Sequence, residues 1–363
     1  MAKKYIETQE QKQTAILAMA VLDSKKDRPK EDLIELKGLA EANNVEVVGE
    51  VVQNRDKPDP AFLLGKGKVQ ELKELVQETN ADMVIFDNLL SGSRLNNLEE
   101  VLGVKVLDRA MLILDIFAQR ALSGEGKLQV ELAQLKYSLP RLNGLTATNN
   151  RYGGGIGMRG PGETKLELNR RIIEKNITQK EKELKKLESE RELRRANRNK
   201  SNKKSVALVG YTNSGKSTLL NSLTKANVLA KDMLFATLDT TTRELYLGDN
   251  KQILITDTVG FVNKLPHELV EAFKSTLMEA VNADLLIHVV DATSKERATQ
   301  EEVVLNVLKS LGATNVPVIT VYNKCDKPYE FIPAGVLKIS AKQNEGLDKL
   351  KQKIIEVLFE SEN

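Results

Sequence analysis

A glycine-rich stretch between a strand and a helix carries the clearest chemistry in this sequence. The apolar run Ser205–Val209 precedes eight residues with the spacing G-x-x-x-x-G-K-S, and Thr218–Lys225 then shows helical spacing. The eight are Gly210, Tyr211, Thr212, Asn213, Ser214, Gly215, Lys216 and Ser217. In this context the backbone N–H groups of the turn and of the helix N-terminus bind phosphate oxygens. We predict that Lys216 binds the β- and γ-phosphates of a nucleotide, and that the Ser217 hydroxyl is a Mg²⁺ ligand.

Two later motifs select the base of that nucleotide. The apolar strand 317–321 leads into Asn323-Lys324-Cys325-Asp326, and the short strand 336–339 leads into Ser340-Ala341-Lys342. A carboxylate at Asp326 can accept both N–H donors of the guanine edge, whereas adenine offers no such pair. The Lys324 stem can lie along the base, and the second motif can offer a backbone N–H to guanine O6. In this order and context the motifs predict GTP and GDP as ligands.

Between these motifs lie two segments that suit a γ-phosphate. The strand 253–256 is followed by Asp257-Thr258-Val259-Gly260, where Asp257 would hold Mg²⁺ through water and the Gly260 N–H would contact the γ-phosphate. Upstream, residues 235–243 form a threonine-rich stretch that we expect to be a loop, and one of its hydroxyls should coordinate Mg²⁺. Such segments become ordered when the γ-phosphate is present, so we expect both to act as switches.

The elements around these motifs predict an α/β protein in three parts. Strand and helix signals alternate along residues 1–109, which favours a parallel sheet covered by helices. Residues 110–200 read as a long helical hairpin: 110–139 are helical until Pro140, residues 143–162 hold a glycine-rich loop, and a charged helix covers about 163–197. Alternation resumes in residues 203–363, which we expect to form a Ras-like P-loop GTPase domain.

The composition of the chain bears on its cellular compartment and on the kind of partner it binds. No apolar run is long enough to span a membrane, and the single cysteine, Cys325, cannot form an internal disulfide, which fits the cytoplasm. The chain carries a net charge of only +3, yet residues 165–204 hold fifteen Lys/Arg against seven Asp/Glu. Because one segment is basic and the rest acidic, we expect a polyanion partner.

Taken together, these residues resemble the HflX family, a ribosome-associated branch of translation-factor-class GTPases close to Obg. Phe235-Ala236-Thr237-Leu238-Asp239 is similar to the family's first switch, which would make Thr237 a direct Mg²⁺ ligand, and residues 257–262 are similar to its second. Residues 64–69, 108–109, 116–121 and 160–164 are similar to recurring segments of the family's N-terminal half. On this resemblance, Lys216, Thr237 and Gly260 would carry hydrolysis.

The resemblance also implies partners. It points to a monomeric cytoplasmic GTPase, partly ribosome-associated, that binds the large ribosomal subunit and splits or rescues ribosomes under stress. Arg151, Tyr152 and Arg159 of the glycine-rich loop would then touch rRNA, together with the basic helix 165–204. An assembly factor that binds RNA without splitting particles is the main alternative. An RNA remodeller with its own ATP site, and a switch that binds proteins alone, are further readings. The absence of a second P-loop disfavours the first of these, and the basic helix disfavours the second.

Two residues bear on how hydrolysis would proceed. Phe261 stands where Ras-like GTPases place the glutamine that orients the attacking water, so we expect slow turnover unless a ribosome supplies order or groups in trans. Asn213 stands where potassium-stimulated GTPases hold K⁺ near the phosphates. The same asparagine could instead cap a backbone turn, and both readings stay open.

Overall fold

The chain packs into two compact units. The computed structural model describes residues 12–22, 28–142, 165–199, 203–224, 233–235, 237–248, 251–266, 269, 273–330 and 332–360. The first unit comprises residues 1–116 and 137–173, and the second comprises residues 117–136 and 174–363. The three-part division expected from the sequence uses other boundaries and stays a prediction. Among the described residues, no helix has both the length and the apolar character needed to cross a bilayer.

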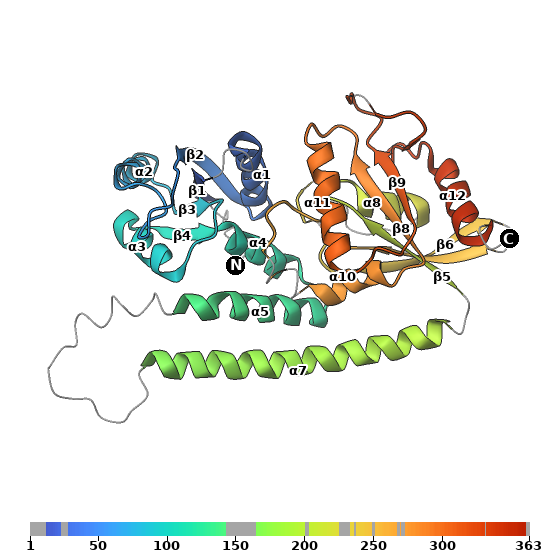
Figure 1. Cartoon of the computed structure of the whole chain (residues 1–363), viewed down its shortest axis with the longest axis horizontal. Coiled ribbons are helices and arrows are strands. Elements are labelled where there is room, and N and C mark those ends of the chain that lie inside the picture. The colour runs from blue at the N-terminus through green and yellow to red at the C-terminus, as the bar shows by residue number, and fades with distance from the viewer. Residues whose placement is uncertain are drawn as a thin grey trace, which may run out of the picture. The chain divides into compact units, whose positions relative to one another are not determined.

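The first unit is built on a four-stranded parallel sheet with the order β2-β1-β3-β4 (Figure 1). Residues 15–20 of the central strand are fully buried, as expected for a parallel strand covered on both faces. The side chains of Ile16, Ala18 and Phe86 form one cluster with apolar residues of α2 and α3. The elements are β1 (Gln13–Val21), α1 (Pro29–Ala42), β2 (Val45–Asn54), α2 (Lys66–Thr79), β3 (Met83–Phe86), α3 (Gly92–Leu102) and β4 (Lys105–Asp108). The alternation predicted for this region is therefore confirmed.

A buried ion-pair cluster closes the carboxyl end of this sheet. The guanidinium of Arg109 lies 2.6 Å from Asp87 Oδ1 and 2.5 Å from Glu35 Oε2. The neighbouring Asp108 accepts hydrogen bonds from Leu90 N at 3.1 Å and from the Tyr137 hydroxyl at 2.5 Å. Removing one partner of a buried ion pair costs about 3–5 kcal/mol, because a buried charge is left unpaired. The Asp108-Arg109 segment thus has a structural role within the first unit.

The second unit holds a six-stranded sheet with the order β10-β9-β8-β5-β7-β6. The only antiparallel neighbours among these strands are β6 and β7. The strands are β5 (Lys204–Val209), β6 (Thr241–Gly248), β7 (Lys251–Asp257), β8 (Leu285–Asp291), β9 (Val318–Asn323) and β10 (Leu337–Lys338). The helices are α8 (Lys216–Thr224), α10 (Lys274–Val281), α11 (Arg297–Ser310) and α12 (Leu347–Ile355), followed by a π-helical segment, Glu356–Glu360. The α/β fold expected for this region is confirmed.

Strand β6 corrects one expectation. The threonine-rich stretch was expected to be a loop as far as Arg243, but β6 already begins at Thr241. Its start pairs with the end of β7, where the hydroxyls of Thr242 and Thr256 lie 2.9 Å apart. Threonine favours strands because its branched Cβ packs well on a pleated surface. The run of threonines therefore extends the sheet edge, and only the part before it remains a loop.

The helical segment after β4 is broken where the sequence predicted continuous helix. Helix α4 (Arg109–Arg120) ends before Ala121, and α5 (Gly124–Ser138) begins three residues later. The Ser123 hydroxyl accepts a hydrogen bond from Gly126 N at 2.8 Å and so caps the first turn of α5. Beyond α5, a short 3₁₀ turn, Leu139–Arg141, contains Pro140, where the helix was expected to stop. A capping serine followed by two glycines was the signal for the break.

Helices α5 and α7 (Lys165–Asn199) run alongside one another in Figure 1. Lys136 of α5 pairs with Glu181 of α7 at 2.7 Å, and Glu131 pairs with Lys180. Ile177, Leu184 and Leu187 of α7 are half-buried in the second unit. Lys180, which lies between these apolar residues, also contacts α5, because its ammonium group pairs with Glu131. The predicted pairing of these helices is confirmed.

Candidate nucleotide site

The motifs predicted to bind a nucleotide surround one cavity of about 350 Å³ in the second unit. It lies at the carboxyl ends of β5, β7 and β9, where parallel α/β sheets usually bind ligands. Predicted residues from all the motifs line it: Thr212, Asn213, Gly215, Lys216, Ser217, Phe235, Thr237, Thr258, Gly260, Asn323, Lys324, Asp326, Ala341 and Lys342. Thr218, Met233 and Lys327 also line the cavity and were not predicted. Segments from residue 212 to residue 342 are therefore brought to a single site.

Lys216 is a buried cation at the floor of this cavity. Its Nζ donates hydrogen bonds to the backbone carbonyls of Gly210 at 3.1 Å and Tyr211 at 2.9 Å. Burial lowers the pKa of Lys216 to about 8; repulsion from Lys324 acts in the same direction, and Asp257 opposes both. A buried ammonium group whose charged form is disfavoured gains most from an anion placed beside it. The site is thus electrostatically suited to phosphate.

Oxygen atoms of three side chains converge beside Lys216. The Ser217 hydroxyl donates to Asp257 Oδ2 over 2.6 Å and lies 2.7 Å from the Thr237 hydroxyl. Burial raises the pKa of the Asp257 carboxyl, against the attraction of Lys216. Its other oxygen, Oδ1, is buried with no hydrogen-bond partner among the described residues. Hydroxyl and carboxylate oxygens are the ligands that Mg²⁺ prefers, and an orphaned carboxylate oxygen suits a bound water of its hydration shell. These residues therefore fit a magnesium ion.

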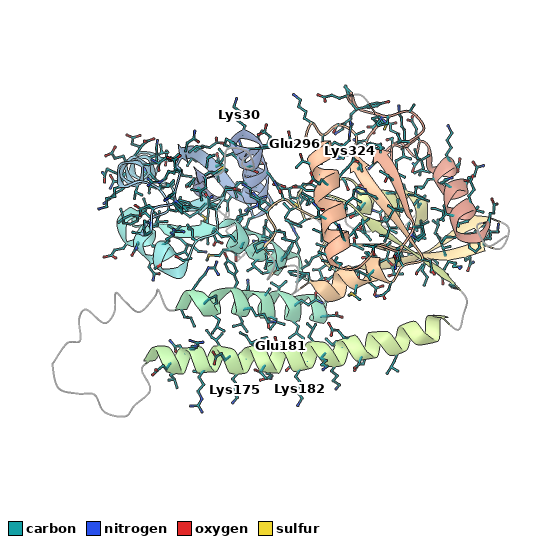
Figure 2. All side chains as sticks on the ribbon, in the orientation of Figure 1. Lys30, Lys175, Glu181, Lys182, Glu296 and Lys324 are labelled. Carbon is teal, nitrogen blue, oxygen red and sulfur yellow. The ribbon has the colours of Figure 1, made fainter. Side chains whose placement is uncertain are left out.

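The opposite end of the cavity is built by the two base-selecting motifs. The Ser340 hydroxyl donates to Asp326 Oδ1 at 2.7 Å, and this hydrogen bond holds the pKa of Asp326 below its usual value. Lys324, labelled in Figure 2, pairs with Asp291 Oδ2 at 2.8 Å. Asp291 was not predicted from the sequence, although its place at the end of the apolar strand β8 was a signal. Asp326 is thus kept ionised as an acceptor, and Lys324 is fixed next to it.

Both switch segments are fastened to the P-loop through Thr212. The Thr212 hydroxyl accepts a hydrogen bond from Phe235 N at 2.7 Å, and its backbone N–H donates to Phe261 O at 2.6 Å. A Cβ placed on Gly260 would lie only 2.7 Å from Thr212 Cα and 3.0 Å from Lys216 Nζ. No side chain fits at Gly260 without moving the P-loop. The second switch therefore needs glycine here to approach the phosphate-binding turn.

Several predicted residues are placed around the cavity rather than on its wall. They are Gly210, Tyr211, Ser214, Leu238, Asp239, Asp257, Val259, Cys325 and Ser340. The Tyr211 hydroxyl accepts from Asn263 N at 2.6 Å, and the Cys325 thiol donates to Tyr322 O at 3.2 Å. Burial raises the pKa of that thiol, which makes it a packing group. Ala236 and the three residues expected to touch RNA, Arg151, Tyr152 and Arg159, lie outside the described residues.

An aromatic contact that was not predicted from the sequence holds the first switch. The Phe235 ring packs edge-on against Phe117 of α4, with centroids 4.8 Å apart, and Phe117 packs in the same way against Phe273 at 4.7 Å. Next to it, the guanidinium of Arg120 donates to Met233 Sδ at 3.1 Å. Nothing in the sequence pattern linked α4 to the switch, because the two segments are more than 100 residues apart. The wall of the cavity thus depends on residues outside the nucleotide motifs.

A P-loop, the two base-selecting motifs and two switch segments around one cavity define a GTP-binding P-loop protein that hydrolyses GTP. The chain is 52% identical over 351 residues to the GTPase HflX of Caldanaerobacter subterraneus subsp. tengcongensis, a match that covers 96% of this chain and 81% of the relative. It is 43% identical over 341 residues to the GTPase HflX of Escherichia coli K12, covering 92% and 80%. The chain belongs to the HflX family of GTPases.

Three family descriptions match successive parts of the chain. Residues 30–118 match the GTP-binding GTPase N-terminal family, and residues 120–198 match the GTP-binding GTPase middle region. Residues 205–324 match the family described as 50S ribosome-binding GTPase. A crystal structure of SsGBP in complex with GDP superposes with a TM-score of 0.51 at 27% identity, covering 96% of this chain and 99% of that one. The family resemblance inferred from the sequence is therefore confirmed along nearly the whole chain.

Proposed function

We propose that this HflX-family GTPase binds the large ribosomal subunit and splits or rescues ribosomes under stress. The observation that carries the proposal is the match of residues 205–324 to a family described as 50S ribosome-binding GTPase. The second candidate is an assembly factor that docks on rRNA with GTP and leaves whole ribosomes intact. The basic segment that begins with α7 favours an RNA partner in either case.

The charge distribution on α7 supports this partner. Lys175 and Lys182 lie on the side of α7 that faces away from α5, whereas Glu181 lies toward α5 (Figure 2). Glu181 pairs there with Lys136, so this acidic group is neutralised within the hairpin. Lys175 and Lys182 on the outer side can replace counterions on a phosphate backbone. The residues expected to reach rRNA, Arg151, Tyr152 and Arg159, belong to the loop outside the described residues and complete the proposal.

In the nucleotide site we assign each group one role. Ser217 and Thr237 would bind Mg²⁺ directly, and Asp257 would bind it through water. Such an ion neutralises charge on the β- and γ-phosphates. Lys216 would neutralise the same oxygens from the P-loop side, and the Gly260 N–H would donate to the γ-phosphate. Asp326 would accept from the guanine edge, and the Ser340-Ala341-Lys342 motif would offer a backbone N–H to guanine O6.

Water positioning is the role that this site leaves to a partner. Phe261 follows Gly260 in the second switch, and its ring is buried in a cluster with Tyr211 and Leu277. A buried phenyl group neither faces the cavity nor accepts a hydrogen bond from water. We infer that isolated turnover is slow and that the ribosome accelerates it. The turnover rate measured with and without large subunits tests this, and equal rates would contradict it.

We infer further that K⁺ assists hydrolysis through Asn213. This residue lines the cavity with a left-handed backbone, φ 60°, a conformation that asparagine tolerates better than most residues. A potassium ion held there would add positive charge near the β- and γ-phosphates. GTP turnover in KCl and in NaCl at equal ionic strength tests the idea. A role limited to forming the turn predicts equal rates in the two salts.

Ribosome sedimentation separates the two candidate functions. Whole ribosomes are incubated with the protein and GTP, GDP or a non-hydrolysable GTP analogue, and free subunits are measured on sucrose gradients. Splitting predicts subunits with GTP and its analogue but not with GDP. An assembly factor predicts that the protein co-sediments with large subunits while whole ribosomes persist. No binding in any nucleotide state would contradict both candidates.

A charge-reversal pair tests the surface. Lys175→Glu with Lys182→Glu should weaken binding about tenfold or more and lower its salt dependence, as expected when about two phosphate contacts are lost. Lys309→Glu with Lys349→Glu changes the net charge equally at exposed positions on α11 and α12 and serves as the control. Equal effects of the two pairs would show a response to net charge alone.

A further inference from the structure

The first switch is anchored on the junction between α4 and α5. Both oxygens of the Asp239 carboxylate are engaged: Oδ2 accepts from Leu122 N at 2.8 Å and from Ser123 N at 2.9 Å, and Oδ1 accepts from the Ser123 hydroxyl. All three donors belong to two consecutive residues just before α5. A carboxylate that accepts several hydrogen bonds from fixed donors makes a strong, directional contact.

This anchor lies two residues from Thr237. At the other end of the same loop, Phe235 is held by its N–H on Thr212 and by its ring on Phe117. Thr237, between the two attachments, lies with its hydroxyl 2.7 Å from the Ser217 hydroxyl. A residue with anchored neighbours on both sides has few conformations left, so little freedom is lost when it binds a ligand.

We propose that Asp239 is a positioning residue for GTP hydrolysis: held by Ser123 and the Leu122 backbone, it keeps the Thr237 hydroxyl beside Ser217 and Asp257. The inference rests on the proposed role of Thr237 as a Mg²⁺ ligand. Asp239 does not line the cavity, so it acts through the loop and not on the nucleotide. Its donors come from the helical segment, which no nucleotide motif includes.

A glycine in α5 allows the anchor to be displaced from outside the switch. A Cβ on Gly126 would lie 2.3 Å from Asp239 Oδ1 and 3.1 Å from the Ser123 hydroxyl. The nearest atom is the end of a side chain and not backbone, so Gly126→Ala should push the Asp239 carboxylate away and leave α5 folded. Alanine is also a better helix former than glycine. Gly124, in the same turn, has nothing within 4 Å of its Cβ position, so Gly124→Ala is the matched control.

The experiment measures kcat and KM for GTP, the Mg²⁺ concentration for half-maximal turnover, and GDP affinity in the full chain. For Gly126→Ala we expect kcat/KM to fall about tenfold and the Mg²⁺ requirement to rise about tenfold, a usual size for coupling between sites. GDP affinity should stay within about twofold, because the Thr237 hydroxyl is expected to coordinate Mg²⁺ only when the γ-phosphate is present. Gly124→Ala should match the original chain in all four quantities.

Three further results decide the inference. Asp239→Ala, which removes the acceptors for the Leu122 and Ser123 N–H groups and the Ser123 hydroxyl, should reproduce the Gly126→Ala effects and so confirm that they arise from loss of the Asp239 contacts. If Gly126→Ala matches Gly124→Ala, or if GDP affinity falls as much as turnover, Asp239 is not a positioning residue. Thr237→Ala tests the role of Thr237 as a Mg²⁺ ligand separately from the role of Asp239. If turnover and the Mg²⁺ requirement do not change in this variant, the proposed role of Thr237 fails. A large effect of Thr237→Ala with a silent Gly126→Ala overturns the anchor alone.

Discussion

The side-chain amide of Asn323 donates a hydrogen bond to the backbone carbonyl of Ser214 over 2.9 Å, which ties the base-binding loop to the P-loop. The carbonyl oxygen of the same amide accepts from Ala341 N, also at 2.9 Å. Asn323 is 2% exposed, so neither bond competes with bulk water. One buried amide thus joins three motifs that bind different parts of the nucleotide. Asn323 therefore holds the P-loop and the two base-selecting motifs at a fixed separation.

Replacing Asn323 with aspartate should weaken GTP and GDP binding equally. The new carboxylate keeps the acceptor for Ala341 N but places a charge without a donor against the Ser214 carbonyl. A buried group left unsatisfied costs about 1–3 kcal/mol, which corresponds to about 5–150-fold in affinity. Titration with fluorescent GTP and GDP analogues measures the change. Asn306→Asp, at an exposed position on α11, is the control. If only the affinity for GTP fell, Asn323 would not act by joining the three motifs.

Asp326→Asn should remove the preference for guanine. An asparagine presents one acceptor where the carboxylate presents two, so one N–H of the guanine edge is left without a partner. The Ser340 hydroxyl, which donates to Asp326 Oδ1, competes for the acceptor that remains. We expect GTP affinity to fall about 100-fold or more, with ATP affinity unchanged. Displacement of a fluorescent GDP analogue by GTP and by ATP measures the ratio of the two affinities.

The control for this change is Asp348→Asn, which removes one negative charge at an exposed position in the first turn of α12. It should leave the GTP-to-ATP ratio as it is. If Asp326→Asn also leaves the ratio intact, Asp326 does not read the guanine edge, and selectivity must come from the backbone around Ala341.

Phe261→Gln should not turn this site into a faster GTPase. The Phe261 side chain is 2% exposed and packs among apolar residues, so a glutamine there would bury an amide instead of reaching the attacking water. We expect isolated turnover to stay within about threefold and the free energy of unfolding to fall by about 2–4 kcal/mol. Phe261→Leu should cost about 1 kcal/mol. Single-turnover hydrolysis and urea unfolding measure the two quantities, and a tenfold faster Phe261→Gln variant would contradict the buried placement.

Much of this site could be predicted because its residues act through local chain geometry. Residues 210–217 form one turn between a strand and a helix, and Asn323 and Asp326 follow the end of β9. Parallel strands bring such ends to one edge of a sheet, so their order along the chain nearly determines the cavity. The alternation of strands and helices in the first unit could also be predicted, because it too follows from local patterns along the chain.

What the sequence did not reveal depends on contacts between distant residues. Ser123 and Asp239 are 116 positions apart, and neither is unusual for its neighbourhood, since serine caps helices and aspartate is common in loops. The break between α4 and α5 was missed because apolar spacing continues across it. Asp291 pairs with Lys324, and Phe117 packs against Phe235. The spacing of apolar residues along the chain does not indicate contacts of this kind. Only packing in three dimensions could show these residues.

His288 should make the second unit less stable in mild acid. It lies in β8, 3% exposed, and burial lowers its pKa to about 4, with repulsion from Lys216 as the second cause. The unfolded chain takes up a proton near pH 6.5, whereas the folded chain does so only near pH 4. Between these values the unfolded state binds more protons, so the free energy of unfolding falls as pH falls. From pH 7 to pH 5 this group should contribute a loss of about 2 kcal/mol.

The test is a comparison of pH dependence, not of absolute stability. His288→Gln cannot take up the proton, so the difference in unfolding free energy between pH 7 and pH 5 should shrink by about 2 kcal/mol. Urea unfolding at the two pH values measures it, and the lower stability expected of the variant at both values cancels in the difference. An unchanged difference would mean that His288 takes up its proton in the folded chain as readily as in the unfolded one. In that case the histidine in β8 would not be desolvated next to Lys216, and the charge balance described for the floor of the cavity would have to be revised.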